Sequence, residues 1–248
     1  MNLRPVYIIW YRDILRFYRE KSQIYTSLFR PVLWLFAFGM GLRPSFQGMG
    51  GFNYVQFIFP GVIAMTLIFT AIGSAISIIW DREFGFLKEI LVAPIHRSWV
   101  VIAKALSGST LAVIQGALVF IFAPFVHVHF TVDQILLSLV VMFLMSMALT
   151  SLGIILAARM SSFEGFGAIM NFVIMPLYFL SGAVYPLKGL PGWLYTVTMI
   201  NPLTYGVDLL RTVMLGIHQF SVLSNIVYLL GFCTLMLTGA LFSLRYES

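Results

Sequence analysis

Long apolar runs dominate the chain and are separated by short polar stretches. A membrane-spanning helix needs about 20 mainly apolar residues, because each adds about 1.5 Å toward about 30 Å of hydrocarbon. Six runs are of about this length or longer and predict spans at residues 24–42, 54–80, 99–126, 134–158, 165–186 and 221–244. The pattern therefore predicts an all-α polytopic membrane protein with six transmembrane helices.

Residues 3–22 show a different pattern, in which apolar residues recur at helical spacing among charges. The apolar face contains Val6, Trp10, Ile14 and Phe17. The basic stripe contains Arg12, Arg16 and Arg19. We expect residues 1–23 to form an amphipathic helix in the membrane interface and residues 24–248 to form the six-span domain. A solvated helix of a small cytoplasmic domain is the alternative, although nothing nearby could complete its core. Because charges interrupt the stretch, it lacks a signal-peptide core, and we expect the N-terminus to be retained.

Charge and composition refine this topology. Sixty per cent of the 248 residues are apolar or aromatic and 10% are charged, whereas about a quarter are charged in an ordinary soluble domain. The net charge of +6 could indicate nucleic-acid binding. With the N-terminus inside, however, only three of the 15 Lys and Arg residues fall outside, namely Arg43, Lys188 and Arg211. This positive-inside bias predicts that both termini are cytoplasmic and makes a nucleic-acid partner unnecessary.

The sequence offers little for a metal site. The one cysteine, Cys233, lies in an apolar run, so neither a disulfide framework nor a thiolate site is available. His127 and His129 form an HxH pattern in a predicted outside loop, but only Asp133 lies near them as a further ligand. We expect no metal.

Residues 186–220 are too broken by proline and glycine for one spanning helix and too apolar for a free loop. Two short helices that dip partway into the membrane from outside satisfy both facts, provided that they pack against the bundle. Trp193, Tyr195 and Tyr205 suit the headgroup level. Asp208 and Arg211 are spaced i, i+3, which favours a local helix ion pair over a cargo contact.

Residues 81–97 carry six of the 24 charged residues. Within residues 81–94, Phe84, Leu87 and Leu91 share one helical face. Arg82, Phe86 and Glu89 lie roughly opposite, and Pro94 ends the helix. An exposed aromatic side chain among charged ones is typical of a surface on which another protein docks. An interfacial loop whose charges only fix the membrane topology explains the pattern equally well. Asp81, Glu83 and Glu89 do not indicate an active site, because no histidine or nucleophile is arranged to use them.

Two segments together carry a family resemblance. LKEILVAPIHR follows the second predicted span, and LSGAVYPLKGLPGWLYTVTMINPLTYGVDLLR, residues 180–211, follows the fifth. The combination resembles the permease subunit of type-2 ABC transporters, the group that includes drug, lipooligosaccharide and polysaccharide exporters. The resemblance covers essentially the whole chain, and the second segment is its most specific part.

The resemblance implies a cytoplasmic coupling helix at residues 81–94 that docks on an ATPase. Its residues here are Asp81, Arg82, Glu83, Phe84, Phe86, Leu87, Lys88, Glu89, Leu91 and Pro94. It also implies re-entrant external helices at residues 186–216 between the fifth and sixth spans. Their candidate residues are Pro186, Pro191, Trp193, Asn201, Pro202, Tyr205, Asp208 and Arg211.

The family pattern further implies two permeases, as a homodimer or with a similar chain, and two ABC ATPase subunits in a bacterial inner membrane. The sequence contains no GxxxxGK[ST], so ATP and Mg²⁺ are expected on the partner, with no cofactor or catalytic residue here. The stretches 57–79, 105–125 and 135–157 contain no ionisable residue, which disfavours ion coupling and favours an amphipathic, drug-like or glycolipid cargo. The alternatives are a polytopic membrane enzyme and a membrane anchor that recruits a cytoplasmic partner without transport.

Overall fold

The computed structural model describes residues 4–20, 25, 29–37, 53–84, 96–128, 130–187 and 189–243. The helices are α1 (Arg4–Arg19), α3 (Tyr54–Ser74), α4 (Ile76–Glu83), α6 (Arg97–Leu118), the 3-10 helix η2 (Val119–Val126), α7 (Val132–Ala158), α8 (Phe163–Phe179), α9 (Gly192–Ile200), α10 (Pro202–Leu215) and α11 (Val222–Ser243). Residues 29–37 are also helical, and the described residues contain no strand. The all-α prediction is confirmed.

Four helical stretches among the described residues are long and apolar enough to cross a membrane: Tyr54–Glu83, Arg97–Val126, Val132–Ala158 and Val222–Ser243. They correspond to four of the predicted spans. For the first predicted span, residues 29–37 are helical, and most of the remaining residues of 24–42 lie outside the described residues. The six-span count therefore stays a prediction.

The fifth predicted span is shorter than the sequence indicated. α8 contains 17 residues and ends at Phe179 rather than near residue 186. The chain turns there because the Ser181 hydroxyl donates to the Tyr178 carbonyl and accepts from the Ala183 N–H. Gly182 follows the turn with a φ of 71°, a left-handed conformation that glycine adopts without steric cost.

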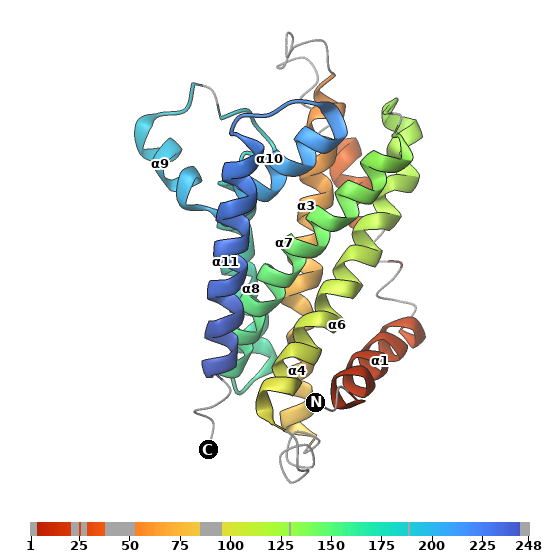
Figure 1. Cartoon of the computed structure of the whole chain (residues 1–248), viewed down its shortest axis with the longest axis vertical. Coiled ribbons are helices and arrows are strands. Elements are labelled where there is room, and N and C mark those ends of the chain that lie inside the picture. Colours follow the sequence, from red (N-terminus) through yellow and green to blue (C-terminus); the bar gives the residue numbers. More distant parts are fainter. Residues whose placement is uncertain are drawn as a thin grey trace.

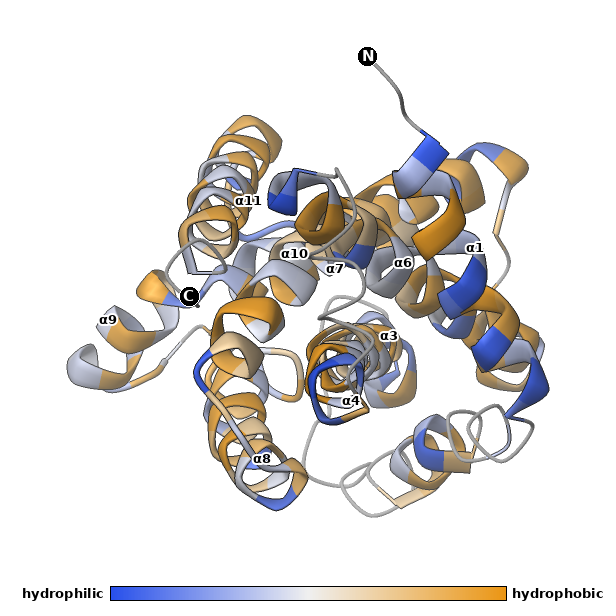
Figure 2. Cartoon of the chain, turned by 90° about the horizontal axis from the view of Figure 1, so that it is seen from below, coloured by the Kyte–Doolittle hydropathy of each residue, from blue (hydrophilic) through white to orange (hydrophobic). Residues whose placement is uncertain are grey.

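α3 lies at the centre of the bundle, surrounded by the other helices (Figure 2). It packs against α6, α7, α8 and α10. Most of its residues are buried and apolar on all sides, the pattern of a helix enclosed by other helices. α1 lies beside one end of α6, while α9 and α10 lie at the opposite end of the molecule (Figure 1).

A close backbone contact holds the segment after α8 against α3. The Tyr54 hydroxyl donates to the Val184 carbonyl over 3.0 Å. A Cβ at Gly61 would clash with the Ala183 carbonyl oxygen and would lie 3.1 Å from Ala183 Cβ. The absence of a side chain at Gly61 therefore sets the distance between α3 and this segment.

Replacing Gly61 by alanine should lower the free energy of unfolding by about 1–3 kcal/mol, because two backbone segments must separate. Unfolding of the purified protein in detergent by increasing SDS measures this change. Gly231→Ala is the matched control, since nothing lies within 4 Å of a Cβ at that position of α11. An equal loss of stability in both variants would contradict the packing role of Gly61.

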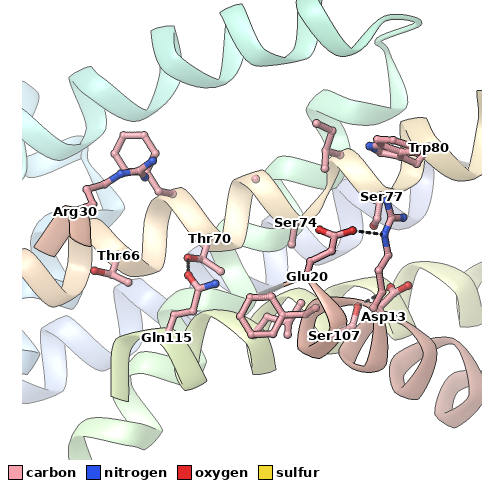
Figure 3. A pocket seen from close by; sticks show the side chains of 16 residues that line it. Asp13, Glu20, Arg30, Thr66, Thr70, Ser74, Ser77, Trp80, Ser107 and Gln115 are labelled. Atoms are coloured by element: carbon pink, nitrogen blue, oxygen red, sulfur yellow. Dashed lines mark hydrogen bonds and ion pairs between the residues drawn. The ribbon is translucent and has the colours of Figure 1, made fainter. Parts of the chain in front are cut away.

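A cavity of about 520 Å³ lies beside α1. Its walls come from α1, α3, α4 and α6, together with Arg30 of the helical residues 29–37 (Figure 3). Many of its lining side chains are polar, although the surrounding helices are mainly apolar.

Candidate functional site

The first candidate site begins with the docking of α1 on α6. Val6 and Ile9 of α1 form a small buried cluster with Val100 and Ala103 of α6. The Trp10 indole N–H donates to the Thr110 hydroxyl over 3.1 Å. Part of the apolar face predicted to meet lipid therefore packs on protein, and this packing fixes the rotation of α1.

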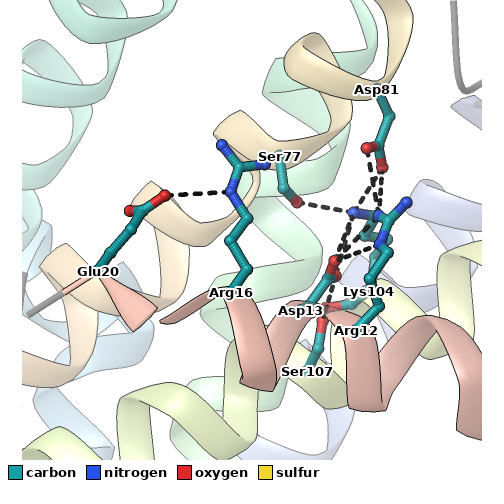
Figure 4. Close-up of polar contacts among 8 residues, drawn as sticks. All are labelled: Arg12, Asp13, Arg16, Glu20, Ser77, Asp81, Lys104 and Ser107. Carbon is teal, nitrogen blue, oxygen red and sulfur yellow. Dashed lines mark hydrogen bonds and ion pairs between the residues drawn. The ribbon is translucent and has the colours of Figure 1, made fainter. Parts of the chain in front are cut away.

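A group of charges joins α1 to α4 and α6, and we call it the ion cluster (Figure 4). Lys104 Nζ lies 3.1 Å from Asp13 Oδ2 and 2.7 Å from Asp81 Oδ2. Arg12 Nη2 lies 3.0 Å from Asp13 Oδ1 and 2.9 Å from Asp81 Oδ2. Ser77 accepts from Lys104, and Ser107 donates to Asp13. The cluster therefore connects α1 to two helices that are distant from it in sequence.

Charge balance explains how this cluster can be buried. The side chains of Lys104, Asp13 and Asp81 are only 3%, 9% and 8% exposed. Two cations and two carboxylates compensate one another, and the serine hydroxyls supply further hydrogen bonds, as buried ions require. Burial lowers the pKa of Arg12, but the charges of Asp13 and Asp81 outweigh it and raise that pKa overall. Arg12 therefore stays charged.

The cluster flanks the segment predicted to couple to an ATPase. α4 ends at Glu83 and α6 begins at Arg97. Asp81 is in the last turn of α4, and Lys104 is two turns into α6. The ion cluster therefore connects α1 to the helix that precedes this segment and to the helix that follows it.

The predicted coupling residues divide into two groups. Asp81 is buried in the ion cluster, and Arg82 donates to the carbonyls of Ala158 and Met160 at the end of α7. The sequence began a separate helix at Asp81, which is wrong because residues 81–83 continue α4. Arg82 supplies donors that the carbonyls at the end of α7 need.

Glu83 and Phe84 remain exposed at the end of α4. Phe84 is 71% exposed and stacks on Trp80, with ring centroids 5.1 Å apart. The other coupling residues lie outside the described residues, namely Phe86, Leu87, Lys88, Glu89, Leu91 and Pro94. Docking of an ATPase on this segment stays a prediction.

Sequence reasoning did not identify Asp13, Lys104, Ser77 or Ser107 as site residues. A signal was present, since Lys104 is a charge inside an otherwise apolar helix after its first turn, and such residues are functional candidates by default. Asp13 similarly interrupts a predominantly basic amphipathic helix. Their pairing could not be read from local patterns.

The predicted external segment forms the second candidate site. It contains two short helices, α9 and α10, as expected. Pro191 precedes α9. The Asn201 side chain accepts from the Leu203 N–H and donates to the Leu177 carbonyl, while Pro202 occupies the first turn of α10. Their depth in a membrane stays a prediction.

Asp208 and Arg211 have separate partners. The Asp208 carboxylate accepts from the N–H groups of Gln219 and Phe220 and from the Asn225 amide, over 2.8–3.1 Å. Arg211 donates to the Gly182 carbonyl and lies 3.9 Å over the Phe57 ring. The predicted ion pair between them is wrong, because each buried charge reaches a different neighbouring segment.

The aromatic residues of this segment also differ in position. Trp193 is 71% exposed and Tyr195 is also exposed, which fits the headgroup contact expected from the sequence. Tyr205 is buried instead, since its hydroxyl donates to the Met199 carbonyl and its ring stacks on Tyr228. Pro186 lies in the irregular segment between α8 and α9.

Of the predicted HxH pair, His127 ends η2 with left-handed backbone, and His129 lies outside the described residues. Within the part of the chain that the structure describes, no three His, Cys, Asp or Glu side chains are grouped as metal ligands.

The sequence is similar to a transporter family profile and to several known proteins. Residues 4–215 match the family profile described as ABC-2 type transporter. Inner membrane transport permease YadH of Escherichia coli K12 is 29% identical over 218 residues, which cover 85% of this chain and 83% of that protein. Nodulation protein J of Rhizobium leguminosarum bv. trifolii is 28% identical over 215 residues, covering 86% and 79%. Putative transport permease ycf38 of Cyanophora paradoxa is 28% identical over 213 residues, covering 84% and 73%.

Proposed function

The chain belongs to the ABC-2 type transporter family, and we propose that it forms the cargo pathway of an exporter driven by a separate ATPase chain. Membership implies a transport subunit that pairs with an ABC ATPase. ATP and Mg²⁺ would be bound by that partner, so the permease would contribute mechanical coupling and a route through the membrane.

The ion cluster is the observation that carries this proposal. It fixes α1 to both α4 and α6. These two helices precede and follow the segment that we assign to ATPase docking. When ATP binds, the two ATPase subunits would close and displace this segment. The buried contacts of the ion cluster would transmit the displacement to the spans that contain α4 and α6. The permease pathway would switch between its closed and open conformations only if the interaction free energy with the ATPase differs between these two conformations.

Exposed apolar surfaces support a chain embedded in a membrane, and we place it in an assembly of two permeases and two ATPases. Leu223, Val227 and Leu235 of α11 and Phe172 of α8 are large and exposed. Patches of this kind need lipid or another protein chain. We assign a bacterial inner membrane, six spans, an interfacial α1, re-entrant α9 and α10, and cytoplasmic termini to this assembly.

The cargo that fits this assembly is amphipathic, either drug-like or a glycolipid. The stretches 57–79, 105–125 and 135–157 offer mainly apolar side chains and no ionisable relay. An ion-coupled carrier usually needs such a relay.

Purification of a tagged copy from its host membrane tests the assignment. A copurifying ATPase with a Walker motif, whose hydrolysis drives flux in reconstituted vesicles, is the expected result. Chemical turnover without ATP would instead indicate a membrane enzyme. Stable binding of another cytoplasmic partner without flux would indicate an anchor.

Reversing the charge of the docking segment should uncouple the two subunits. Glu83→Lys and Glu89→Lys should each lower permease-stimulated ATP hydrolysis and transport by about tenfold or more, because unfavourable charge contacts cost several kcal/mol at an interface. Membrane insertion should be unchanged. Glu164→Lys, an exposed acid in the first turn of α8, is the matched control. Normal coupling in both docking variants would reject the assignment of this segment.

A further inference from the structure

The cavity beside α1 has the size and chemistry of a ligand site. Its volume of about 520 Å³ falls within the range of about 300–1,000 Å³ typical of small-molecule sites. Its apolar walls include Phe17, Phe69 and Leu111, and its polar walls include Thr66, Thr70 and Gln115. A ligand that fits both surfaces must itself be amphipathic.

The polar side offers the Gln115 amide as a hydrogen-bond donor, because the neighbouring threonine hydroxyls already donate to other groups. The Thr66 hydroxyl donates to the Val62 carbonyl, and the Thr70 hydroxyl donates to the Gln115 side-chain oxygen. Gln115 is buried, and its amide nitrogen has no hydrogen-bond partner among the described residues. Figure 3 shows this amide beside Thr70 in the middle of the cavity, with Arg30 at one end and Asp13 at the other.

Three of the four charges in the cavity wall are already compensated. Asp13 is paired with Arg12 and Lys104, and Arg16 is paired with Glu20 over 3.2 Å. Arg30 has neither a carboxylate nor a hydrogen-bond acceptor among the described residues, and its guanidinium lies 4.1 Å over the Phe69 ring. The cavity wall therefore contains one uncompensated positive charge and an unused amide donor.

A buried or membrane-embedded cation gains most from an anionic partner, and a guanidinium binds phosphate or carboxylate through paired hydrogen bonds. We propose that the cavity binds a single-chain anionic amphiphile, with its phosphate or carboxylate at Arg30 and Gln115 and its chain along Phe17, Phe69 and Leu111. This inference rests on the proposed function, which places the cavity in the membrane. It adds a class of ligand to that function. The ligand is either a lipid of the bilayer or the cargo.

The cavity is also connected to the ion cluster. Asp13, Ser77 and Ser107 belong to the cluster and line the cavity. An occupant would therefore lie against the same side chains that fix α1 to α4 and α6.

Binding can be measured on the purified permease without any ATPase. The probe is a lysophosphatidate with a photoreactive diazirine in its chain, and the expected label is on the peptides that contain Phe17, Phe69 or Leu111. Unlabelled lysophosphatidate should compete, whereas lysophosphatidylcholine, which has no net charge, should compete at least about tenfold more weakly. This comparison needs no variant, so it tests the proposal even if a substitution prevents folding.

Substitutions at Arg30 test the role of its charge. Arg30→Gln should weaken lysophosphatidate binding by about tenfold or more, as expected for a lost charge-assisted hydrogen bond. Arg30→Glu should abolish it and should allow the cationic amphiphile dodecyltrimethylammonium to bind instead. Arg19→Gln is the matched control, since Arg19 is exposed on α1 and does not line the cavity. Equal affinity in all three variants, or label scattered over lipid-facing helices, would overturn the proposal.

Reconstitution with the ATPase distinguishes the two sources of ligand. ATP-dependent movement of the bound probe to the other leaflet would identify it as cargo. Binding without movement would identify a bilayer lipid at the site. Both results support the site, and loss of ATPase coupling with intact binding would reject only the proposed transport function.

Discussion

Replacing Lys104 by methionine should lower the free energy of unfolding by about 3–5 kcal/mol, because it breaks a buried ion network at one partner. Asp13 and Asp81 would then share the single charge of Arg12. α1 should separate from α4 and α6, and ATPase coupling should fall with it. SDS unfolding of the purified permease measures the loss of stability, and protease cleavage within residues 4–20 measures the separation of α1.

Two comparisons separate the buried network from charge in general. Glu20→Gln removes an exposed pair on the same helix segment, and its effect should stay below about 1 kcal/mol. The double variant Lys104→Met with Asp13→Asn removes one charge of each sign, so it should recover part of the stability. If Lys104→Met were as mild as Glu20→Gln, the cluster would not hold α1 in place.

Replacing Asp208 by alanine should lower the free energy of unfolding by about 2–5 kcal/mol, because it leaves several donors without an acceptor. The affected groups are the N–H groups of Gln219 and Phe220 and the buried Asn225 amide. The connection between α10 and α11 should open first, since this carboxylate accepts hydrogen bonds from two of its N–H groups. Hydrogen exchange at Gln219 and Phe220 should become faster, and SDS unfolding should report the overall loss.

The control for Asp208 is an acid with no such network. Asp133 lies exposed in the first turn of α7, where a carboxylate contributes about 0.3–1 kcal/mol through the helix dipole. Asp133→Ala should therefore change stability little and leave exchange at Gln219 unchanged. Slow exchange at Gln219 and Phe220 in Asp208→Ala would show that other contacts hold the connection.

Local patterns in the sequence were sufficient for the helices and the family. The length of apolar runs predicted four spans that the structure confirms as long apolar helices, because bilayer thickness sets helix length. Prolines and glycines predicted the break between α8 and α11 and the two short helices within it. The segments LKEILVAPIHR and 180–211 were enough to indicate the transporter family.

The same patterns failed where a side chain has to choose a distant partner. The i, i+3 spacing of Asp208 and Arg211 suggested a mutual pair, yet they bind Asn225 and the Gly182 carbonyl on other segments. Tyr205 is of a residue type that is common at the level of lipid headgroups, but it is buried and stacks on Tyr228. Helical periodicity describes which face a residue occupies and carries no information about what packs on that face.

The sequence by itself determined the all-helical character of this protein, the position of its apolar helices and its membership in a transporter family, because these depend on residue types over short windows. Only the tertiary structure decided that Asp13, Asp81 and Lys104 meet with Arg12, since Arg12 is 69 residues from Asp81 and Asp13 is 91 residues from Lys104. It also decided that Arg30 faces a cavity without a counter-charge among the described residues. Ion pairing depends on distances of a few ångströms, which the packing of whole helices sets.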